Sequence, residues 1–573
     1  MEAGFIHKGI EVDEPFYILA AMPMEVCVRF PRHVLLLASL VIGACTTSLP
    51  VEQMTPDTST RTLTASPTPT PTPTPLVEYP APAWFESAVV YEIFVRSFAD
   101  SDEDGIGDLV GIQQQLDYLL ALSVDAIWLM PIYPSPSVHG YDVIDPFEIN
   151  PDYGTHADLL SLVEAAHARG IRVILDFVPS HVSNQHPYFL DAYRNPESAY
   201  TDWFVWTNDA HTTYATFAGV AEMPRLNHYN PEVVNYLIEA ALFWMDLDGD
   251  GELDDGIDGF RIDNATFPPQ ELTVELRQAL KAVNPEVLLL GEAWLHNHTD
   301  LARYYPDQFD ALFDFPLYEL LQGDHASNGD GLLAGRGFPA LLRSQLEESF
   351  DILPEGALAV RFLSNHDTNR IRSEVRSDEA RLRFAARVLV TLPGPILLYY
   401  GEEIGMPGQK GGAPYYDHYR REPMDWYAGE EGTIQTTWFV PEDRWNQPLD
   451  GVSVEEQVDV TTSILNEYRR LLALRAENPA LQRGDMQFLD LEATTRGPIG
   501  YRLLSDTGSL IVVHHFGEEP ALVRIALDPS EMGEYVDLFR GNPAGNVDAE
   551  GFLVIELEPA DSVLLARTEN TID

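Results

Sequence analysis

The chain has 573 residues, of which 90 are acidic and 35 basic, and its formal net charge at pH 7 is -55. This charge disfavours nucleic acids and anionic lipid surfaces as partners, because both would repel the protein. The length suits a large barrel with additional domains. Cys27 and Cys45 are the only cysteines, which excludes a disulfide framework in the body of the chain.

Residues 29–45 begin with Arg29 and Arg32, continue as a short apolar run and end at Cys45. The run is too short for a comfortable transmembrane helix and matches an export signal. Residues 42–45, IGAC, resemble the bacterial lipoprotein box, which implies that Cys45 is the lipidated first residue of the mature chain. A plain signal peptide and an uncleaved anchor are the alternatives. We therefore expect an exported protein that meets the membrane of the bacterial cell surface only through its lipid anchor.

Residues 46–83 are rich in threonine and proline, and Pro-Thr is repeated as far as Pro75. This composition cannot bury a core and favours extended polyproline II. The segment is predicted to be a stiff spacer between the anchor and the body, and a disordered tail is the alternative.

From residue 88 onward, apolar runs typical of strands alternate with helical patterns. The eight predicted strands are 89–98, 125–132, 171–178, 259–263, 287–294, 310–317, 358–365 and 395–401, and clear helical patterns occupy 108–122, 156–170, 230–245 and 461–477. Eight such units close a (β/α)8 TIM barrel, which makes this an α/β fold.

Two further segments do not fit the barrel itself. Residues 182–229 are too long for a simple loop after the third strand, so we expect a small inserted domain there. After residue 480, short β runs separated by turns predict a C-terminal antiparallel β-sandwich. The predicted domains are a signal and lipoprotein segment at 1–45, a linker at 46–83, a catalytic barrel with its insertion at 84–480, and the sandwich at 481–573.

Acidic residues stand where the predicted strands end. Asp263 and Glu292 lie in the C-terminal parts of predicted strands four and five, and Asp367 comes just after strand seven. For each acid alone, a helix cap or an ion pair is the commoner explanation. Barrel enzymes, however, carry their chemistry at the carboxyl ends of the strands, so all three are predicted to converge on one pocket. The accompanying polar residues are Tyr141, Asp142, His181, Arg261 and His366.

The motifs around these residues resemble those of the alpha-amylase family of retaining α-glucoside hydrolases. The matching stretches are DFVPSH (176–181), GFRID (259–263), GEAW (291–294) and FLSNHD (362–367), with support from HGYDVIDPFEINPDYGT (139–155) and PMDW (423–426). The resemblance implies that Asp263 is the nucleophile, Glu292 the acid/base and Asp367 the stabiliser of the transition state. It also implies a set of substrate-binding residues, namely Tyr141, Asp142, His181, Arg261 and His366.

A retaining glycosidase needs one ionised and one protonated carboxyl group, about 5–5.5 Å apart. We expect Arg261 to lower the pKa of Asp263, since a neighbouring cation favours the charged form. Glu292 lies between the apolar residues Leu290 and Trp294, which favours its protonated form.

The segment 100–108 places acidic residues at alternate positions of a loop that contains glycine. Oxygen ligands with this spacing and a tight turn suit Ca²⁺. The family has a calcium loop of this form after its first strand, so the resemblance implies as ligands Asp100, Asp102, Asp104, Asp108 and the carbonyl group of Ile106. A solvated acidic loop is the alternative.

A second acidic loop imitates the start of an EF-hand, with Asp246, Asp248, Asp250 and Asp254 at the ligand positions. Ile257 stands at position twelve, where an EF-hand requires glutamate. A second metal site and a plain acidic insertion are therefore both open.

Together these features predict a calcium-containing glycosidase that cleaves the α-1,4 bonds of an α-glucan, starch or maltodextrin. A maltodextrin glucosidase, a cyclomaltodextrinase and a glucanotransferase are alternatives within the family. Alternatives from other classes are a non-catalytic surface protein that binds glycans and a solute-binding lipoprotein. Neither needs a poised pair of acids, which the chain retains.

Overall fold

The computed structural model describes residues 78–253, 255–323 and 331–568. The predicted signal segment, Cys45 and almost all of the Thr/Pro-rich linker lie outside these residues. Within the described part of the chain, no helix combines the length and apolar character needed to cross a bilayer.

Eight parallel strands form a closed barrel in the order of the sequence, and β1 pairs with both β2 and β8. The strands are β1 (Val89–Ile93), β2 (Ala126–Leu129), β3 (Arg172–Phe177), β4 (Gly259–Ile262), β5 (Leu288–Gly291), β6 (Ala311–Phe313), β7 (Leu358–Phe362) and β8 (Ile396–Tyr399). Each lies within one of the eight predicted runs, so the predicted (β/α)8 barrel is confirmed.

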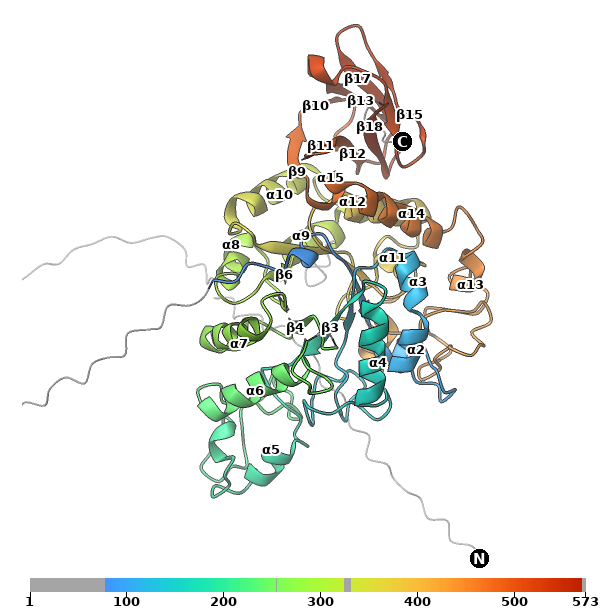
Figure 1. The fold of residues 1–573 in the computed structure, drawn as a ribbon. Coiled ribbons are helices and arrows are strands. Elements are labelled where there is room, and N and C mark those ends of the chain that lie inside the picture. The colour runs from blue at the N-terminus through green and yellow to red at the C-terminus, as the bar shows by residue number, and fades with distance from the viewer. Residues whose placement is uncertain (1–77, 254, 324–330, 569–573) are drawn as a thin grey trace, which may run out of the picture. The chain divides into compact units, whose positions relative to one another are not determined.

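The barrel helices and the helices that follow them are drawn in Figure 1. They are α1 (Val95–Phe98), α2 (Leu109–Gln114), α3 (Leu116–Ala121), α4 (His156–His167), α6 (Pro231–Phe243), α7 (Gln270–Val283), α8 (His298–Leu301), α9 (Phe315–Gln322), α10 (Ala340–Ile352), α11 (Ile371–Glu374), α12 (Glu379–Thr391), α13 (Val454–Gln457), α14 (Ile464–Glu477) and α15 (Pro479–Arg483). The helix predicted at 108–122 is divided, because Gln115 has non-helical backbone angles.

The segment between β3 and α6 contains little regular structure. It holds α5 (Pro187–Ala192), the 3-10 helix η2 (Thr201–Trp203) and isolated bridges such as that between Phe204 and Leu226. Aromatic rings hold it together, as in the stacked pair of Tyr188 and Tyr200 with centroids 3.9 Å apart. That this segment is a domain of its own stays a prediction.

The C-terminal region forms two antiparallel sheets, as predicted. One has the order β10-β13-β17-β16 and the other β15-β14-β18-β12-β11-β9. Ile511 and Leu565 of the second sheet share a buried core with Val523 and Leu553 of the first. The strands are β9 (Asp485–Leu489), β10 (Leu491–Ala493), β11 (Pro498–Ser505), β12 (Gly508–His515), β13 (Ala521–Ala526), β14 (Tyr535–Asp537), β15 (Asn542–Pro543), β16 (Asn546–Val547), β17 (Phe552–Leu557) and β18 (Asp561–Arg567).

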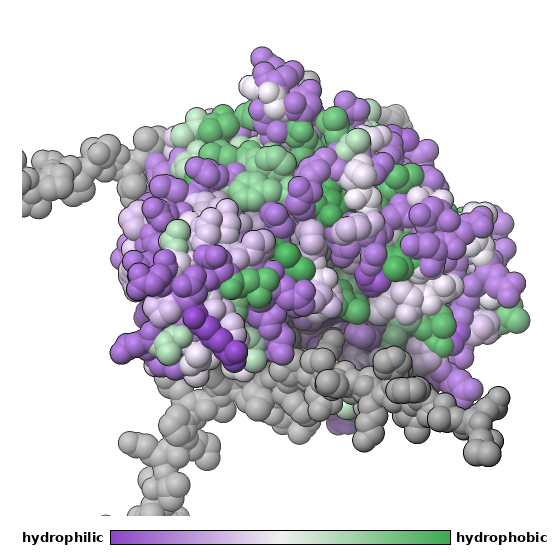
Figure 2. All heavy atoms as spheres, turned by 90° about the horizontal axis from the view of Figure 1, so that it is seen from below, coloured by the Kyte–Doolittle hydropathy of each residue, from purple (hydrophilic) through white to green (hydrophobic). Residues whose placement is uncertain are grey.

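The interior of the barrel is packed with apolar side chains, including Trp128, Phe313 and Leu397. The guanidinium carbon of Arg261 lies 5.1 Å from the centre of the Trp128 ring, so the charged residues of β3 and β4 sit directly against this apolar layer. Outside, the face in Figure 2 shows hydrophobic side chains in small groups among hydrophilic ones.

Candidate active site

Arg261 is the centre of the predicted site and is almost fully buried. Its Nη1 lies 2.9 Å from Oδ1 of Asp263 and 3.0 Å from Oδ1 of Asp176, and its Nη2 lies 2.8 Å from Oε2 of Glu292. Alternate residues of a strand face the same way, which explains why Arg261 and Asp263 meet. One guanidinium group therefore holds three carboxylates from the ends of β3, β4 and β5.

These contacts determine which carboxylate oxygen of Asp263 and which of Glu292 is not engaged by Arg261. Oε2 of Glu292, which is ion-paired with Nη2 of Arg261, also accepts a hydrogen bond from the backbone N–H of Asn264 at 2.9 Å. Among the described residues, neither Oε1 of Glu292 nor Oδ2 of Asp263 has a hydrogen-bond partner. Both side chains are 11% exposed, so each keeps one oxygen available to a ligand.

His366 connects the third predicted acid to this group. Its Nδ1 lies 2.5 Å from Oε1 of Glu92, and its Nε2 lies 2.8 Å from the Tyr141 hydroxyl and 3.2 Å from Oδ2 of Asp367. The Tyr141 hydroxyl donates to Oδ2 of Asp176 at 3.1 Å. The three predicted catalytic acids thus belong to one continuous network of polar contacts.

Asp367 is the most accessible of the three acids, with 38% of its side chain exposed. Its other oxygen, Oδ1, accepts a hydrogen bond from Nη2 of Arg421 at 3.0 Å. Although burial opposes ionisation, His366 and then Arg421 hold the pKa of Asp367 far below its usual range. Asp367 is therefore a fixed negative charge at the mouth of the site.

The pKa of Asp263 differs from the prediction. Burial raises it to about 8; Arg261 opposes this rise, but the carboxylates of Glu292 and Asp176 add to it. Burial also raises the pKa of Asp176 to about 6. Arg261 lowers the pKa of Asp263, as predicted, but burial, together with the two neighbouring carboxylates, outweighs this effect, so the net shift is upward.

His366 is shifted toward its charged form. Burial favours the neutral imidazole, but the negative charges of Asp367 and Glu92 outweigh burial and raise the pKa of His366 to about 10. The Tyr141 ring lies nearly parallel to the imidazole, with centroids 5.6 Å apart. A protonated His366 is therefore held between two carboxylates and beside an aromatic face.

Two of the predicted substrate-binding residues, His181 and Asp142, have hydrogen-bond partners other than the three predicted catalytic acids. His181 stacks on Phe217 at 4.5 Å and binds the Ser180 hydroxyl through Nδ1, while its Nε2 is buried without a partner among the described residues. Burial lowers the pKa of His181 to about 3, so the ring is neutral. Asp142 is turned toward its own loop, where Oδ1 accepts hydrogen bonds from the hydroxyl groups of Ser135 and Ser137. Direct contact between Asp142 and a sugar stays a prediction.

Three members of the network had no role assigned from the sequence, namely Glu92, Arg421 and Asp176, of which Asp176 was placed only within the motif DFVPSH. A signal existed for Glu92 and Asp176, because both are charged residues next to apolar residues in buried parts of strands, and charged side chains are rarely fully buried unless paired. Arg421 lies beyond β8 in an irregular segment, where no periodicity marks it.

The first predicted metal loop brings carboxylates together. Oxygens of Asp100, Asp102 and Asp108 lie within 4.8 Å of one another. Asp104 is outside this group, and its Oδ1 instead accepts the backbone N–H of Ile106 at 2.8 Å. Three carboxylate oxygens at this spacing fit a hard divalent cation.

The second acidic loop differs from its prediction. The group whose oxygens lie within 4.8 Å consists of Asp246, Asp248 and Asp255. Asp250 is not part of it, and its Oδ1 accepts the backbone N–H of Glu252 at 2.8 Å. Asp254 lies outside the described residues. Among the described residues, the group therefore combines Asp246 and Asp248 of the predicted set with Asp255, and the part played by Asp254 stays a prediction.

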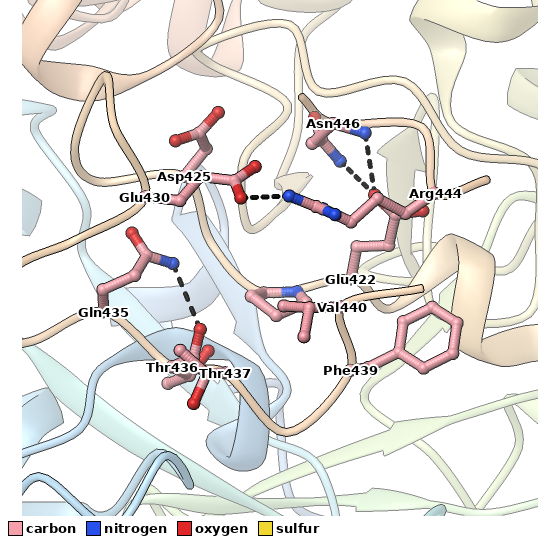
Figure 3. A pocket seen from close by; sticks show the side chains of 11 residues that line it. Glu422, Asp425, Glu430, Gln435, Thr436, Thr437, Phe439, Val440, Arg444 and Asn446 are labelled. Atoms are coloured by element: carbon pink, nitrogen blue, oxygen red, sulfur yellow. Dashed lines mark hydrogen bonds and ion pairs between the residues drawn. The ribbon is translucent and has the colours of Figure 1, made fainter. Parts of the chain in front are cut away.

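A small pocket occurs in the irregular segment after β8, and Figure 3 shows the Glu430 carboxylate facing the Arg444 guanidinium. Its volume is about 30 Å³, enough for a water molecule but not for a sugar. It is lined by none of the three predicted catalytic acids.

Residues 92–484 match the family model described as "Alpha amylase, catalytic domain". The chain is 35% identical over 450 residues to "Alpha-amylase 3" of Dictyoglomus thermophilum, which covers 75% of this chain and 85% of that protein. It is 29% identical to a cyclomaltodextrinase of Bacillus sp, with 76% of each chain covered. Among solved structures, an alpha-amylase from H.orenii has a TM-score of 0.72 at 35% identity, covering 84% of this chain and 99% of that one.

Proposed function

Because this chain belongs to the alpha-amylase family of glycoside hydrolases, we propose that it cleaves the α-1,4 bonds of starch or maltodextrins with retention of anomeric configuration. The observation that carries the proposal is the placement of Asp263 and Glu292 on the two amino groups of one arginine, Arg261. This pairing holds two carboxyl groups close together, as a double displacement requires.

In this mechanism Asp263 attacks the anomeric carbon through Oδ2, since Oδ1 is engaged by Arg261. Glu292 protonates the departing glycosidic oxygen from Oε1, because Oε2 is already ion-paired with Arg261 and accepts a hydrogen bond from the Asn264 N–H. Glu292 then accepts a proton from the water that releases the sugar from Asp263.

The mechanism needs one proton on the pair, and it must be on Glu292 when the bond breaks. The raised pKa of Asp263, about 8, supplies that proton at neutral pH. Its transfer from Asp263 to Glu292 leaves the total charge around Arg261 unchanged. Ionised Asp367 adds a fixed negative charge near the anomeric carbon, where positive charge develops.

The substrate side of the proposal rests on Tyr141 and His366. The Tyr141 ring is held by its hydroxyl group between Asp176 and His366, and it offers an apolar face for a glucose ring. Protonated His366 and Arg421 fix Asp367 from two sides. His181 has a buried Nε2 without a partner among the described residues, which suits a hydrogen bond to a sugar hydroxyl group.

The test combines stereochemistry with variants. Wild-type enzyme acting on maltoheptaose should release the α-anomer, detected by NMR before mutarotation. Asp263→Asn and Glu292→Gln should each lower kcat by about 10³-fold or more, since each removes a group that acts in the transition state. Asp117→Asn, on an exposed face of α3, is the matched control. Release of the β-anomer, or near-normal activity of either folded variant, would overturn the assignment.

Cyclomaltodextrinase activity is the second candidate, and the similarity to the cyclomaltodextrinase of Bacillus sp favours it. Product analysis separates the candidates. An α-amylase degrades starch faster than β-cyclodextrin, whereas a cyclomaltodextrinase opens the ring faster. Formation of products longer than the maltoheptaose supplied indicates glucanotransferase activity, and release of glucose alone indicates a glucosidase.

We also propose that the protein is exported and anchored through Cys45, followed by a proline-rich spacer. The support is sequence alone, because these residues lie outside the described part of the chain. In a bacterial host, the wild type should sediment with membranes and Cys45→Ser should not. Equal membrane fractions for both proteins would contradict the anchor.

A further inference from the structure

The loop between α6 and β4 has its two ends in contact. The Ile257 N–H donates to the Trp244 carbonyl at 3.0 Å, and a Cβ atom at Gly256 would lie 1.9 Å from the Met245 carbonyl oxygen. The two ends of the loop therefore touch, and only glycine permits this approach. Leu247 and Leu253 pack against the main core. The acidic residues between these points are held over a fixed base.

Three carboxylates converge inside this loop. Oxygens of Asp246, Asp248 and Asp255 lie within 4.8 Å of one another. Asp255 is 9% exposed; its Oδ2 accepts the Asp248 N–H at 2.9 Å, while its Oδ1 is buried without a hydrogen-bond partner among the described residues. A buried carboxylate oxygen without a partner is costly, so Asp255 is an independent indication that a ligand belongs here.

The charge of the loop points to the kind of ligand. Residues 246–255 contain six acidic residues and no basic one. No lysine or arginine in the described part of the chain forms an ion pair with any member of the group. By contrast, Asp258, just after the loop, is paired with His167 at 2.8 Å and Arg172 at 2.6 Å. A cation is the missing counter-charge.

We propose that this loop binds one Ca²⁺ ion through Asp246, Asp248 and Asp255. A set of ligands made only of oxygen atoms favours Ca²⁺ over the smaller and more strictly octahedral Mg²⁺. Asp255 precedes the first residue of β4, Gly259, by four positions, and β4 carries Arg261 and ends beside Asp263. The ion therefore stabilises the connection between α6 and the strand at the centre of the site.

The test counts bound metal on the full-length protein. After dialysis against CaCl₂ and removal of free ion, calcium per chain is measured for the wild type, Asp255→Asn and Asp248→Asn. Each variant should hold one ion fewer than the wild type. This difference does not depend on whether the loop at 100–108 also binds calcium. Glu252→Gln, an exposed acid of the same loop outside the group, is the matched control and should hold the wild-type number.

Thermal scanning supplies a second readout. Adding CaCl₂ to chelated protein should raise the melting temperature less for Asp248→Asn than for Glu252→Gln. Asp248 is exposed, so its substitution leaves the packing of the loop intact even where Asp255→Asn impairs folding. Equal calcium content in the wild type and Asp248→Asn overturns the proposal. Because neither readout uses activity, this result would leave the proposed hydrolase function untouched.

Discussion

At the scale of single residues, the site is governed by the number of carboxylates that share one cation. Arg261 binds Asp263, Glu292 and Asp176 at once. Lysine could not replace it, because an ammonium group lacks the planar fork that separates Asp263 on Nη1 from Glu292 on Nη2. The excess negative charge keeps a proton on the cluster at neutral pH.

We expect the activity to depend on that proton. Asp263 has a pKa of about 8, so the cluster loses its proton as the pH rises through this value. Glu292 then has none to give to the glycosidic oxygen, and kcat/KM should fall about tenfold for each pH unit above about 8. Initial rates on maltoheptaose in a buffer series test this prediction. A rate that stays constant up to pH 10 would contradict it.

The same shift predicts how stability depends on pH. The pKa of Asp263 is 3.8 in a free chain and about 8 in the fold, so the native state binds an extra proton between these values. Stability contributed by this group therefore falls as the pH rises from about 4 to about 8. Asn does not titrate, so Asp263→Asn removes this fall in stability with pH. The melting temperature of the variant should therefore exceed that of the wild type by a few degrees at pH 8 and by less at pH 5. A difference independent of pH would contradict the assignment.

At the scale of elements, the loop at 100–108 both brings carboxylates together and caps the helix that follows it. Asp108 belongs to the carboxylate group and also caps α2, where its Oδ1 accepts the Gly111 N–H at 2.7 Å. Asp102 belongs to the group but caps no helix, so the two tasks can be separated by substitution. We propose that this loop holds the structural Ca²⁺ of the body, through Asp100, Asp102 and Asp108.

Thermal unfolding with and without EDTA tests both tasks. Calcium should raise the melting temperature of the wild type, and Asp102→Asn should reduce this gain. In EDTA, Asp108→Ala should be about 1 kcal/mol less stable than Asp108→Asn, because asparagine still caps the helix and alanine does not. An equal calcium response of the wild type and Asp102→Asn would argue against a metal in this loop.

At the scale of the whole molecule, the C-terminal sheets are joined to the barrel helices by buried contacts. The Tyr501 hydroxyl of β11 lies 3.0 Å from Oγ1 of Thr391 on α12. Arg387 of α12 pairs with Asp561 of β18 at 3.1 Å. Tyr501, Leu503 and Val512 belong to the same buried cluster as the barrel helices. The sheets therefore cover an apolar surface of the barrel.

A chain that ends at residue 484 should be largely insoluble, since it exposes this surface to water. A chain that begins at residue 78 keeps every described element and should remain soluble and active. Soluble yield and size-exclusion chromatography compare the two. A monodisperse, fully active product from the shorter chain would show that the contacts are dispensable.

The sequence by itself determined the barrel, the C-terminal sheets and the family. It did so because strand periodicity and short motifs are local patterns, and Asp263, Glu292 and Asp367 follow strands whose ends can be read from those patterns. The catalytic roles of the three acids stay predictions. The structure adds the polar contacts that hold each acid in its own place in the network.

Only the tertiary structure decided which groups meet. Glu92 and His366 are 274 positions apart yet touch, Asp142 turns toward Ser135 and Ser137, and Asp255 joins Asp246 and Asp248. The pKa of Asp263 rises instead of falling, because it depends on burial and on every charge around Arg261. These contacts and charge effects involve residues from distant segments of the chain, so no local sequence pattern can predict them.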